Sequence, residues 1–130
     1  MEQQFYEQIK RILSEARNKV YQTANFAMVE AYWNIGKSIV EQQDGYEKAE
    51  YGSRLIAELS KQMTIDFGKG FTPTNLKYMR QFYLTFPNSH ALRDELSWTH
   101  YRLLMRVENK NAREFYTEEA IKSNWSKIGR

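Results

Sequence analysis

Two histidines are the side chains in this sequence best suited to holding a metal ion or moving a proton. His90 and His100 lie ten positions apart, and neither has a second histidine at the four-residue spacing that zinc-binding helices use. Cysteine is absent from the 130 residues, which removes disulfides, thiolate metal sites and cysteine nucleophiles together. We therefore predict no metal and no cofactor, with His90 at the surface and His100 packed or capping a helix.

A second candidate for chemistry is a set of two acids and a lysine. Asp94, Glu108 and Lys110 match the loose D-x(n)-E-x-K pattern of metal-dependent nucleases, in which two carboxylates hold Mg²⁺ and the lysine orients water. In those enzymes the three residues lie on paired strands of a small sheet. Here residues 98–107 have the spacing of a helix and Lys110 falls in a predicted turn. We interpret the match as accidental, predict no catalytic residue, and predict that this chain is not an enzyme.

Two further motifs have simpler structural explanations. Gly68-Lys69-Gly70 has no preceding strand, so it matches neither a dinucleotide-binding nor a phosphate-binding loop and is typical of a turn between helices. The acidic pairs Asp94-Glu95 and Glu118-Glu119 are adjacent, and on a helix adjacent side chains point about 100° apart. We expect both pairs to lie in solvent.

Length and composition indicate one globular domain over residues 1–130. The chain has a mass of 15.6 kDa, 42% hydrophobic residues and 27% charged residues, which suits a single packed core. Aromatic residues reach 15%, so bulky rings should dominate that core. No apolar run approaches the roughly 20 residues of a membrane span, and no signal-peptide pattern opens the chain. We expect a cytoplasmic protein without a membrane partner.

Positive charge is concentrated in one part of the chain. The formal net charge is +3, but residues 69–113 carry eight basic side chains against three acidic ones, a local net charge of +5. Such an excess suits an anionic partner such as nucleic acid. An excess of this size is also common by chance.

Apolar residues recur every three or four positions, which predicts helices throughout. One apolar face runs from Phe5 to Val20 and another from Val29 to Val40, and the polar stretch 18–25 between them is either a continuation or a break. A turn is expected at residues 44–46. The next helix should cover residues 49–67, with Gly68 as its C-terminal glycine. Its expected inward side chains are Leu55, Ile56, Leu59, Met63 and Phe67.

The clearest helix start in the chain lies at Thr72-Pro73. Thr72 can cap the first amides, Pro73 suits the first helical position, and Phe71 can pack on Leu76 as a hydrophobic staple. The helix should run from residue 73 to 86 and stop before Pro87. Together with residues 49–67 it forms a helix-turn-helix-like pair at about 49–86, and its second helix would be the recognition helix.

At 100° per residue, this recognition helix separates a core side from a polar side. The predicted core side chains are Leu76, Met79, Tyr83 and Phe86, and the predicted DNA-binding side chains opposite them are Thr74, Lys77, Tyr78 and Gln81. Arg80 lies nearer the buried edge, which suits either a phosphate contact or an internal ion pair. The full set of candidate phosphate contacts is Lys69, Arg80, Arg102, Arg106 and Lys110.

The remaining elements are expected to be shorter. A polar loop should span residues 88–95, followed by a helix over 98–107 that Ser97 caps, with Trp98 and Tyr101 packed inward. A base-stacking role for Trp98 is the alternative. A turn at 109–111 should lead into a last helix, which Asn111 caps and which ends near Trp125. This helix is either interrupted at Thr117 or continuous through it.

Several blocks of sequence resemble one protein family. They include the segments AYWNIG at 31–36, FGKGFT at 67–72, MRQFY at 79–83, LSWTHY at 96–101 and REFY at 113–116. In this order, and across residues 9–127, the chain is similar to the N-terminal domain of the YhcG-like bacterial proteins. The resemblance implies a DNA-targeting module that precedes a nuclease domain of the PD-(D/E)-x-K class. Family proteins continue into that domain whereas this chain stops at Arg130, so the resemblance leads us to expect no counterpart of the catalytic residues here.

Two hypotheses for function follow. The first is a non-catalytic module that binds duplex DNA through the helix at 73–86. The alternative is an assembly module without nucleic-acid contact, which would present Phe5, Ile9 and Ile12, or Tyr32 and Trp33, to a second copy in a homodimer or to the C-terminal nuclease domain of the parent protein.

Overall fold

The computed structural model describes residues 3–43 and 49–128, and it confirms the predicted all-α class. Five α-helices and one short 3-10 helix cover most of these residues, and no strand occurs among them. In chain order the elements are α1 (Gln3–Gln43), α2 (Ala49–Phe67), α3 (Pro73–Thr85), η1 (Ser89–Ala91), α4 (Trp98–Leu104) and α5 (Lys110–Ile128). The turn predicted at residues 44–46 lies outside the described residues.

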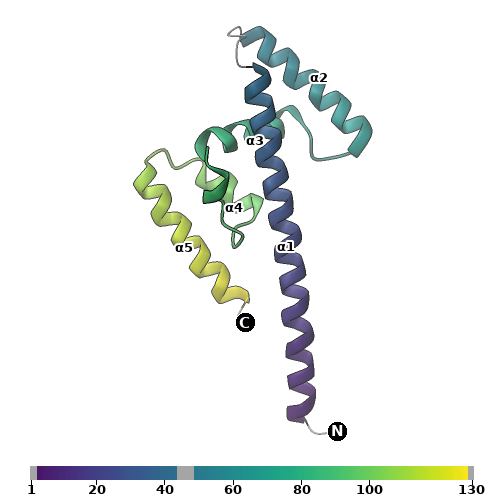
Figure 1. Ribbon diagram of the computed structural model, residues 1–130, viewed down its shortest axis with the longest axis vertical. Coiled ribbons are helices and arrows are strands. Elements are labelled where there is room, and N and C mark those ends of the chain that lie inside the picture. The colour runs from purple at the N-terminus through teal and green to yellow at the C-terminus, as the bar shows by residue number, and fades with distance from the viewer. Residues whose placement is uncertain (1–2, 44–48, 129–130) are drawn as a thin grey trace.

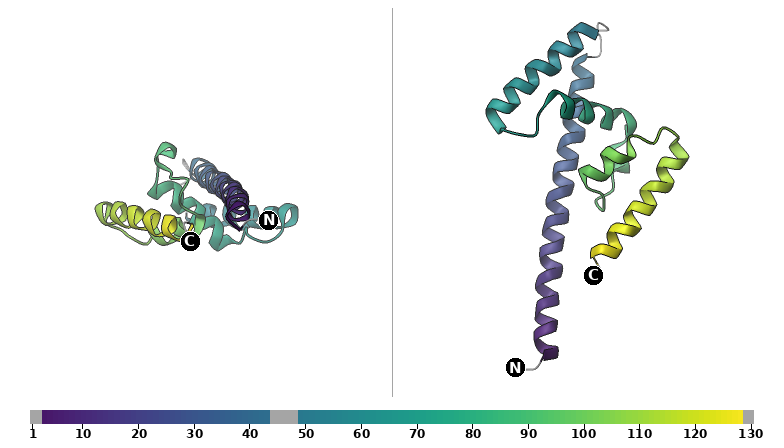
Figure 2. Two further views of the ribbon diagram at one scale, coloured as in Figure 1. Left: turned by 90° about the horizontal axis from the view of Figure 1, so that it is seen from below. Right: turned by 180° about the vertical axis from the view of Figure 1, so that it is seen from behind.

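α1 is one continuous helix of 41 residues, so the polar stretch 18–25 continues the helix without a break. Figures 1 and 2 show α1 as the long axis of the structure, with α2 near its C-terminal end, α3 crossing its C-terminal half, and α4 and α5 on one side of it. Every side chain from residue 3 to 20 is exposed, and the first buried residue of α1 is Val29. We call residues 3–20 the α1 arm, because this part of the helix extends away from the rest of the fold (Figure 1).

The connection between α2 and α3 has the local structure that the sequence predicts. Gly68 ends α2 with a φ of 81°, and Gly70 has a φ of 111°, both in the region that favours glycine. Thr72 caps α3, since its hydroxyl accepts a hydrogen bond of 3.1 Å from the backbone N–H of Asn75. The buried Ser60 hydroxyl of α2 donates to the carbonyl oxygen of Phe71 at 2.7 Å. These contacts fix the point at which α3 begins.

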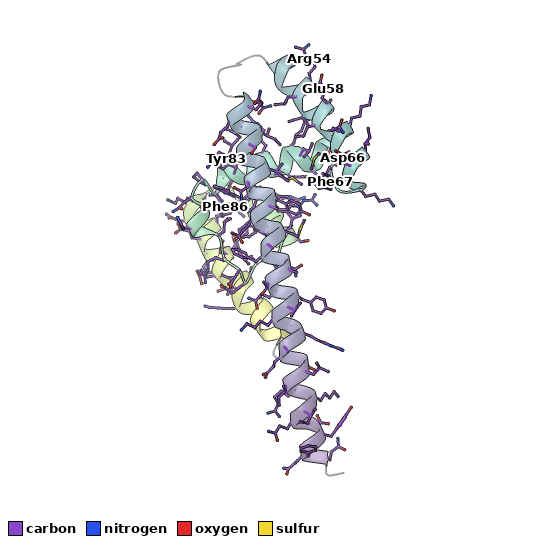
Figure 3. All side chains as sticks on the ribbon, turned by 45° about the vertical axis from the view of Figure 1, so that its right-hand side comes forward. Arg54, Glu58, Asp66, Phe67, Tyr83 and Phe86 are labelled. Carbon is purple, nitrogen blue, oxygen red and sulfur yellow. The ribbon has the colours of Figure 1, made fainter. Side chains whose placement is uncertain are left out.

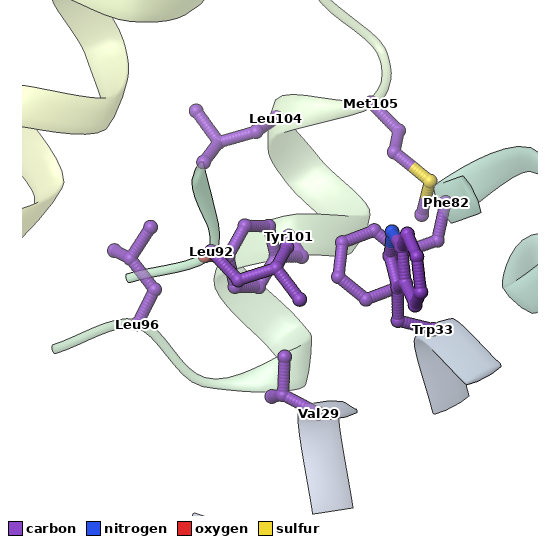
Figure 4. Packing of buried hydrophobic residues seen from close by; sticks show 8 residues of the cluster. All are labelled: Val29, Trp33, Phe82, Leu92, Leu96, Tyr101, Leu104 and Met105. Carbon is purple, nitrogen blue, oxygen red and sulfur yellow. The ribbon is translucent and has the colours of Figure 1, made fainter. Parts of the chain in front are cut away.

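Aromatic rings dominate the larger of two apolar clusters, as the composition predicts. The rings of Phe82 and Tyr101 lie 4.8 Å apart, and the rings of Phe82 and Trp98 lie 5.2 Å apart. Figure 4 shows how α1, α3, α4 and the loop before α4 all contribute to this cluster. Its buried members are Val29, Trp33, Phe82, Leu92, Leu96, Tyr101, Leu104 and Met105. The smaller cluster joins α1, α2 and α3 through Ile39, Ile56, Leu76 and Met79.

The buried side of α3 is wider than predicted. Leu76 and Met79 are buried as expected, but Tyr83 and Phe86 are half-buried. Phe82, which is not among the predicted core residues, is fully buried. The reason is that α3 packs on two sides, against α1 and against α4. Phe86 is the C-cap of the helix, and its carbonyl oxygen accepts a hydrogen bond of 2.7 Å from the indole N–H of Trp33.

Other expectations need correction. Phe67 was expected to face inward, but it is 68% exposed at the last turn of α2. α5 begins at Lys110 and not after residue 111, because Asn109 acts as its cap by accepting a hydrogen bond of 3.0 Å from the N–H of Ala112. α5 is continuous through Thr117 and ends beyond the predicted residue 125. α4 is shorter than predicted, and η1 lies within the segment expected to be an irregular loop.

Candidate nucleic-acid interface

α3 keeps its polar side in solvent. Thr74, Lys77 and Gln81 are exposed, and Tyr78 is half-buried at the edge of the same face. They lie opposite Leu76 and Met79, the side chains that bury α3 against α1 and α2. α3 therefore presents an ammonium, an amide, a hydroxyl and a phenol together, which are groups that hydrogen-bond to DNA bases and phosphates.

Tyr78 brings this face into contact with α4. The guanidinium carbon of Arg102 lies 4.4 Å from the centre of the Tyr78 ring, a cation–π geometry. Hydrogen bonds from Arg102 and then Arg106, together with their positive charges, lower the pKa of the Tyr78 hydroxyl. Tyr78, Arg102 and Arg106 thus form one cluster that joins a predicted base-contacting residue to two predicted phosphate-contacting residues. We call it the Tyr78 cluster.

The start of α4 is fixed by a reciprocal cap. The Ser97 hydroxyl accepts from the backbone N–H of His100 at 3.4 Å, and the His100 ring nitrogen Nδ1 accepts from the backbone N–H of Ser97 at 3.1 Å. This confirms the predicted capping by Ser97, and His100 has the capping role that the sequence allowed. The Trp98 ring packs 5.0 Å from that of Tyr32, so this end of α4 is anchored against α1. Arg102 and Arg106 follow on the last turn of α4 and just beyond it.

The other phosphate candidates have different surroundings. Lys69 lies exposed in the connection between α2 and α3, and Lys110 lies exposed at the start of α5, so neither belongs to the Tyr78 cluster. Arg80 is half-buried, and its Nε donates a hydrogen bond of 2.6 Å to the side-chain oxygen of Gln43. The described partner of Arg80 is thus a neutral amide on α1.

Two arginines counted in the positive segment are held by other parts of the fold. Arg93 forms ion pairs of 2.9 Å with both Glu95 and Glu118. Arg113 donates to the carbonyl oxygens of Val107 at 3.0 Å and Glu108 at 3.2 Å. The positive charge of the surface around α3 and α4 is consequently supplied by other residues, and neither helix contains an acidic residue.

The residues that match the nuclease pattern lie in three different segments between η1 and α5. Asp94 lies in the turn before α4, Glu108 in the connection to α5, and Lys110 at the first position of α5. Within residues 3–43 and 49–128, no three His, Asp or Glu side chains converge as metal ligands. Asp94 and Glu95 lie in a turn and not on a helix, and a hydrogen bond from Asp94, with partial burial, raises the pKa of Glu95.

The Tyr78 cluster could not be found from the sequence. Tyr78 and Arg102 are 24 positions apart, and their contact depends on how α4 packs on α3. The sequence did contain one signal, because the chain from residue 67 to 93 and from 96 to 107 has no acidic side chain.

None of the described helices is both long enough and apolar enough to cross a lipid bilayer.

Comparison with known proteins gives two matches. A family model described as the DUF1016 N-terminal domain matches residues 8–128. A protein of Escherichia coli (strain K12) named "Putative nuclease YhcG" is 30% identical over 157 aligned positions, which include 95% of this chain and 42% of that protein. The chain thus spans less than half the length of that relative. No solved structure matches.

Proposed function

The chain belongs to the DUF1016 N-terminal domain family, and from this premise we propose that it is a non-catalytic module that binds duplex DNA through α3. The observation that supports the proposal is the Tyr78 cluster. It places two arginines beside the exposed polar face of α3, on a surface to which neither helix contributes an acid.

The arrangement suits the two kinds of contact that duplex DNA requires. α3 has 13 residues, about 20 Å of helix, and an α-helix fits the major groove, which is about 12 Å wide. Thr74 and Gln81 would face the base edges, and Lys77 on the same face would neutralise a phosphate. Arg102 and Arg106, held beside the same helix by Tyr78, would reach the phosphates that border the groove.

We propose a modified helix-turn-helix interpretation of α2 and α3. α2 and α3 are joined by a short glycine-containing turn, as such a motif requires. However, α3 packs more extensively on α1 than on α2. In this domain α1 would therefore be the main support of the recognition helix.

The name of the E. coli relative suggests what the module serves. We infer that in a longer cytoplasmic protein of this family the domain directs a nuclease region to duplex DNA. The catalytic residues would lie in that region, and the present domain would supply affinity and positioning. This inference extends the DNA-binding proposal and depends on it.

Binding to a mixed-sequence duplex at two salt concentrations tests the proposal. We assume that five side chains each neutralise one phosphate: Lys69, Lys77, Arg102, Arg106 and Lys110. A plot of the logarithm of the binding constant against the logarithm of the salt concentration should then have a slope of about −4.5. Affinity should then drop several hundred-fold between roughly 50 and 200 mM salt. Absent binding, or binding that salt does not weaken, would refute the proposal.

A pair of variants tests the role of α3 itself. Lys77→Ala/Gln81→Ala should lower affinity roughly tenfold while the helical circular dichroism is retained. Gln8→Ala/Arg11→Ala likewise removes one amide and one cation, from the α1 arm, far from α3 in Figure 1, and should leave affinity unchanged. Equal affinities for the two double variants would show that α3 is not the DNA-contacting helix.

A further inference from the structure

The α1 arm carries a row of large apolar side chains that no other part of the described fold covers. Their exposed fractions lie between 44% for Tyr6 and 67% for Val20. Figure 3 shows the side chains of this part of α1 extending into open space, with no other helix beside them. The row consists of Phe5, Tyr6, Ile9, Ile12, Leu13 and Val20, with the small Ala16 between them.

The spacing of this row is that of a coiled coil. Tyr6, Ile9, Leu13, Ala16 and Val20 follow one another at alternating steps of three and four residues, which is the spacing of the a and d positions of a heptad repeat. A helix that only lies on a lipid surface needs an apolar side but no heptad alternation. The narrow heptad row therefore favours another helix as its partner.

The core of this domain cannot supply that helix. At 100° per residue, the centre of the row lies about 180° around α1 from Val29 and Gly36, which are buried against the rest of the fold. The row thus faces away from α3, α4 and α5. Its partner must come from outside the domain, and the domain does not obstruct it.

The row is complementary to itself. The a and d residues form the seam between the two helices. In a parallel pair, each g residue beside this seam meets the e residue five positions later on the partner helix. Phe5 then meets Lys10 and Ile12 meets Arg17, so the aliphatic stems of the cations cover apolar side chains. In an antiparallel pair Lys10 would instead lie beside Arg17, which is repulsive.

The available area also reaches what a stable pair requires. Burying six half-exposed apolar side chains on each of two helices removes on the order of 1,000 Å² of surface from water. This is about the smallest buried area of a specific protein–protein interface. We propose that the α1 arm pairs in parallel with the α1 arm of a second copy of this chain, as a two-stranded coiled coil. The pairing does not depend on DNA binding.

Sedimentation equilibrium tests the pairing. The intact chain should have a mass twice 15.6 kDa, and Ile9→Glu/Leu13→Glu should reduce it to 15.6 kDa. Gln4→Glu/Ser14→Glu adds the same two charges to the arm away from the row and should remain a dimer. A monomeric intact chain, a trimer or tetramer, or a dimer that survives Ile9→Glu/Leu13→Glu would overturn the proposal.

Introduced cysteines test the orientation, because the chain has no cysteine of its own. In a parallel pair position 20 faces position 20 of the other copy, so Val20→Cys should form an interchain disulfide on mild oxidation. Ser14→Cys lies outside the seam and should not. A dimer in which Val20→Cys does not cross-link would overturn the parallel arrangement. Circular dichroism of each variant establishes that the helices are intact.

Discussion

Gly36 on α1 lies so close to Met79 on α3 that a methyl group at position 36 would overlap the carbonyl oxygen of Met79. Both residues are buried, and Met79 is 1% exposed. The missing side chain therefore allows the two helix backbones to touch. Because α3 carries the proposed DNA-binding face, this contact determines where that face stands relative to α1.

Replacing Gly36 with alanine should destabilise the protein. In an unpacked helix this change stabilises by about 1 kcal/mol, since alanine has the higher helix propensity. Here we expect a loss of roughly 1–3 kcal/mol, because α1 and α3 must move apart to admit the methyl group. Urea unfolding of Gly36→Ala followed by circular dichroism measures the difference. A gain in stability would show that the helices do not approach this closely.

The Tyr101 hydroxyl should make stability depend on alkaline pH. Tyr101 is 1% exposed, and burial raises the pKa of its phenol. The unfolded chain then releases this proton near pH 10 while the folded chain retains it, so stability falls as pH rises above about 10. Tyr101→Phe should remove this part of the pH dependence. If the difference in unfolding free energy between wild type and Tyr101→Phe is the same at about pH 8 and about pH 11, the assignment is contradicted.

At neutral pH the same variant should be less stable. The Tyr101 hydroxyl accepts a hydrogen bond of 2.7 Å from the backbone N–H of Arg93 and donates one of 3.3 Å to its carbonyl oxygen. Phenylalanine leaves both backbone groups without this partner, which should cost about 1–3 kcal/mol. Thermal unfolding of wild type and Tyr101→Phe at neutral pH measures this loss, and equal melting temperatures would contradict it.

Features of the fold that depend on neighbouring residues could be predicted from the sequence. Thr72 before Pro73 fixed the start of α3, Gly68 fixed the end of α2, and Ser97 fixed the start of α4, because a cap is made by residues within one turn of the helix end. Asn109 was missed because Asn111 offers a similar capping pattern two residues later.

Features that depend on packing could not be predicted in the same way. Helical spacing placed the centre of the buried side of α3 correctly, but it could not show that α4 covers Phe82 from a second side. Net charge along the chain counts Arg93 and Arg106 equally. The ion pair between Arg93 and Glu118 joins residues 25 positions apart, and only the packing of α5 reveals it.

Tyr78 should ionise at a lower pH than an ordinary tyrosine. Hydrogen bonds from Arg102 and Arg106 stabilise the phenolate and lower the pKa of Tyr78 below its usual value near 10. An alkaline titration of tyrosinate absorbance should therefore show an early phase that Tyr78→Phe removes. The Arg102→Gln/Arg106→Gln variant should shift this phase upward. An early phase that persists in Tyr78→Phe would belong to another tyrosine, and the Tyr78 cluster would be incorrect.

Two arginines that are equivalent in the sequence should behave differently towards DNA. Arg106 is exposed beside α3, whereas Arg93 is held between Glu95 and Glu118 at 2.9 Å from each. Releasing Arg93 for a phosphate would require breaking both ion pairs. Arg106→Gln should therefore weaken binding and reduce the steepness of the salt dependence by about one phosphate, while Arg93→Gln should leave that steepness unchanged. Each variant loses one positive charge, so an effect of net charge alone would reduce the steepness of the salt dependence equally in both. Salt titrations of both variants on one duplex separate these outcomes, and equal slopes would remove Arg106 from the proposed interface.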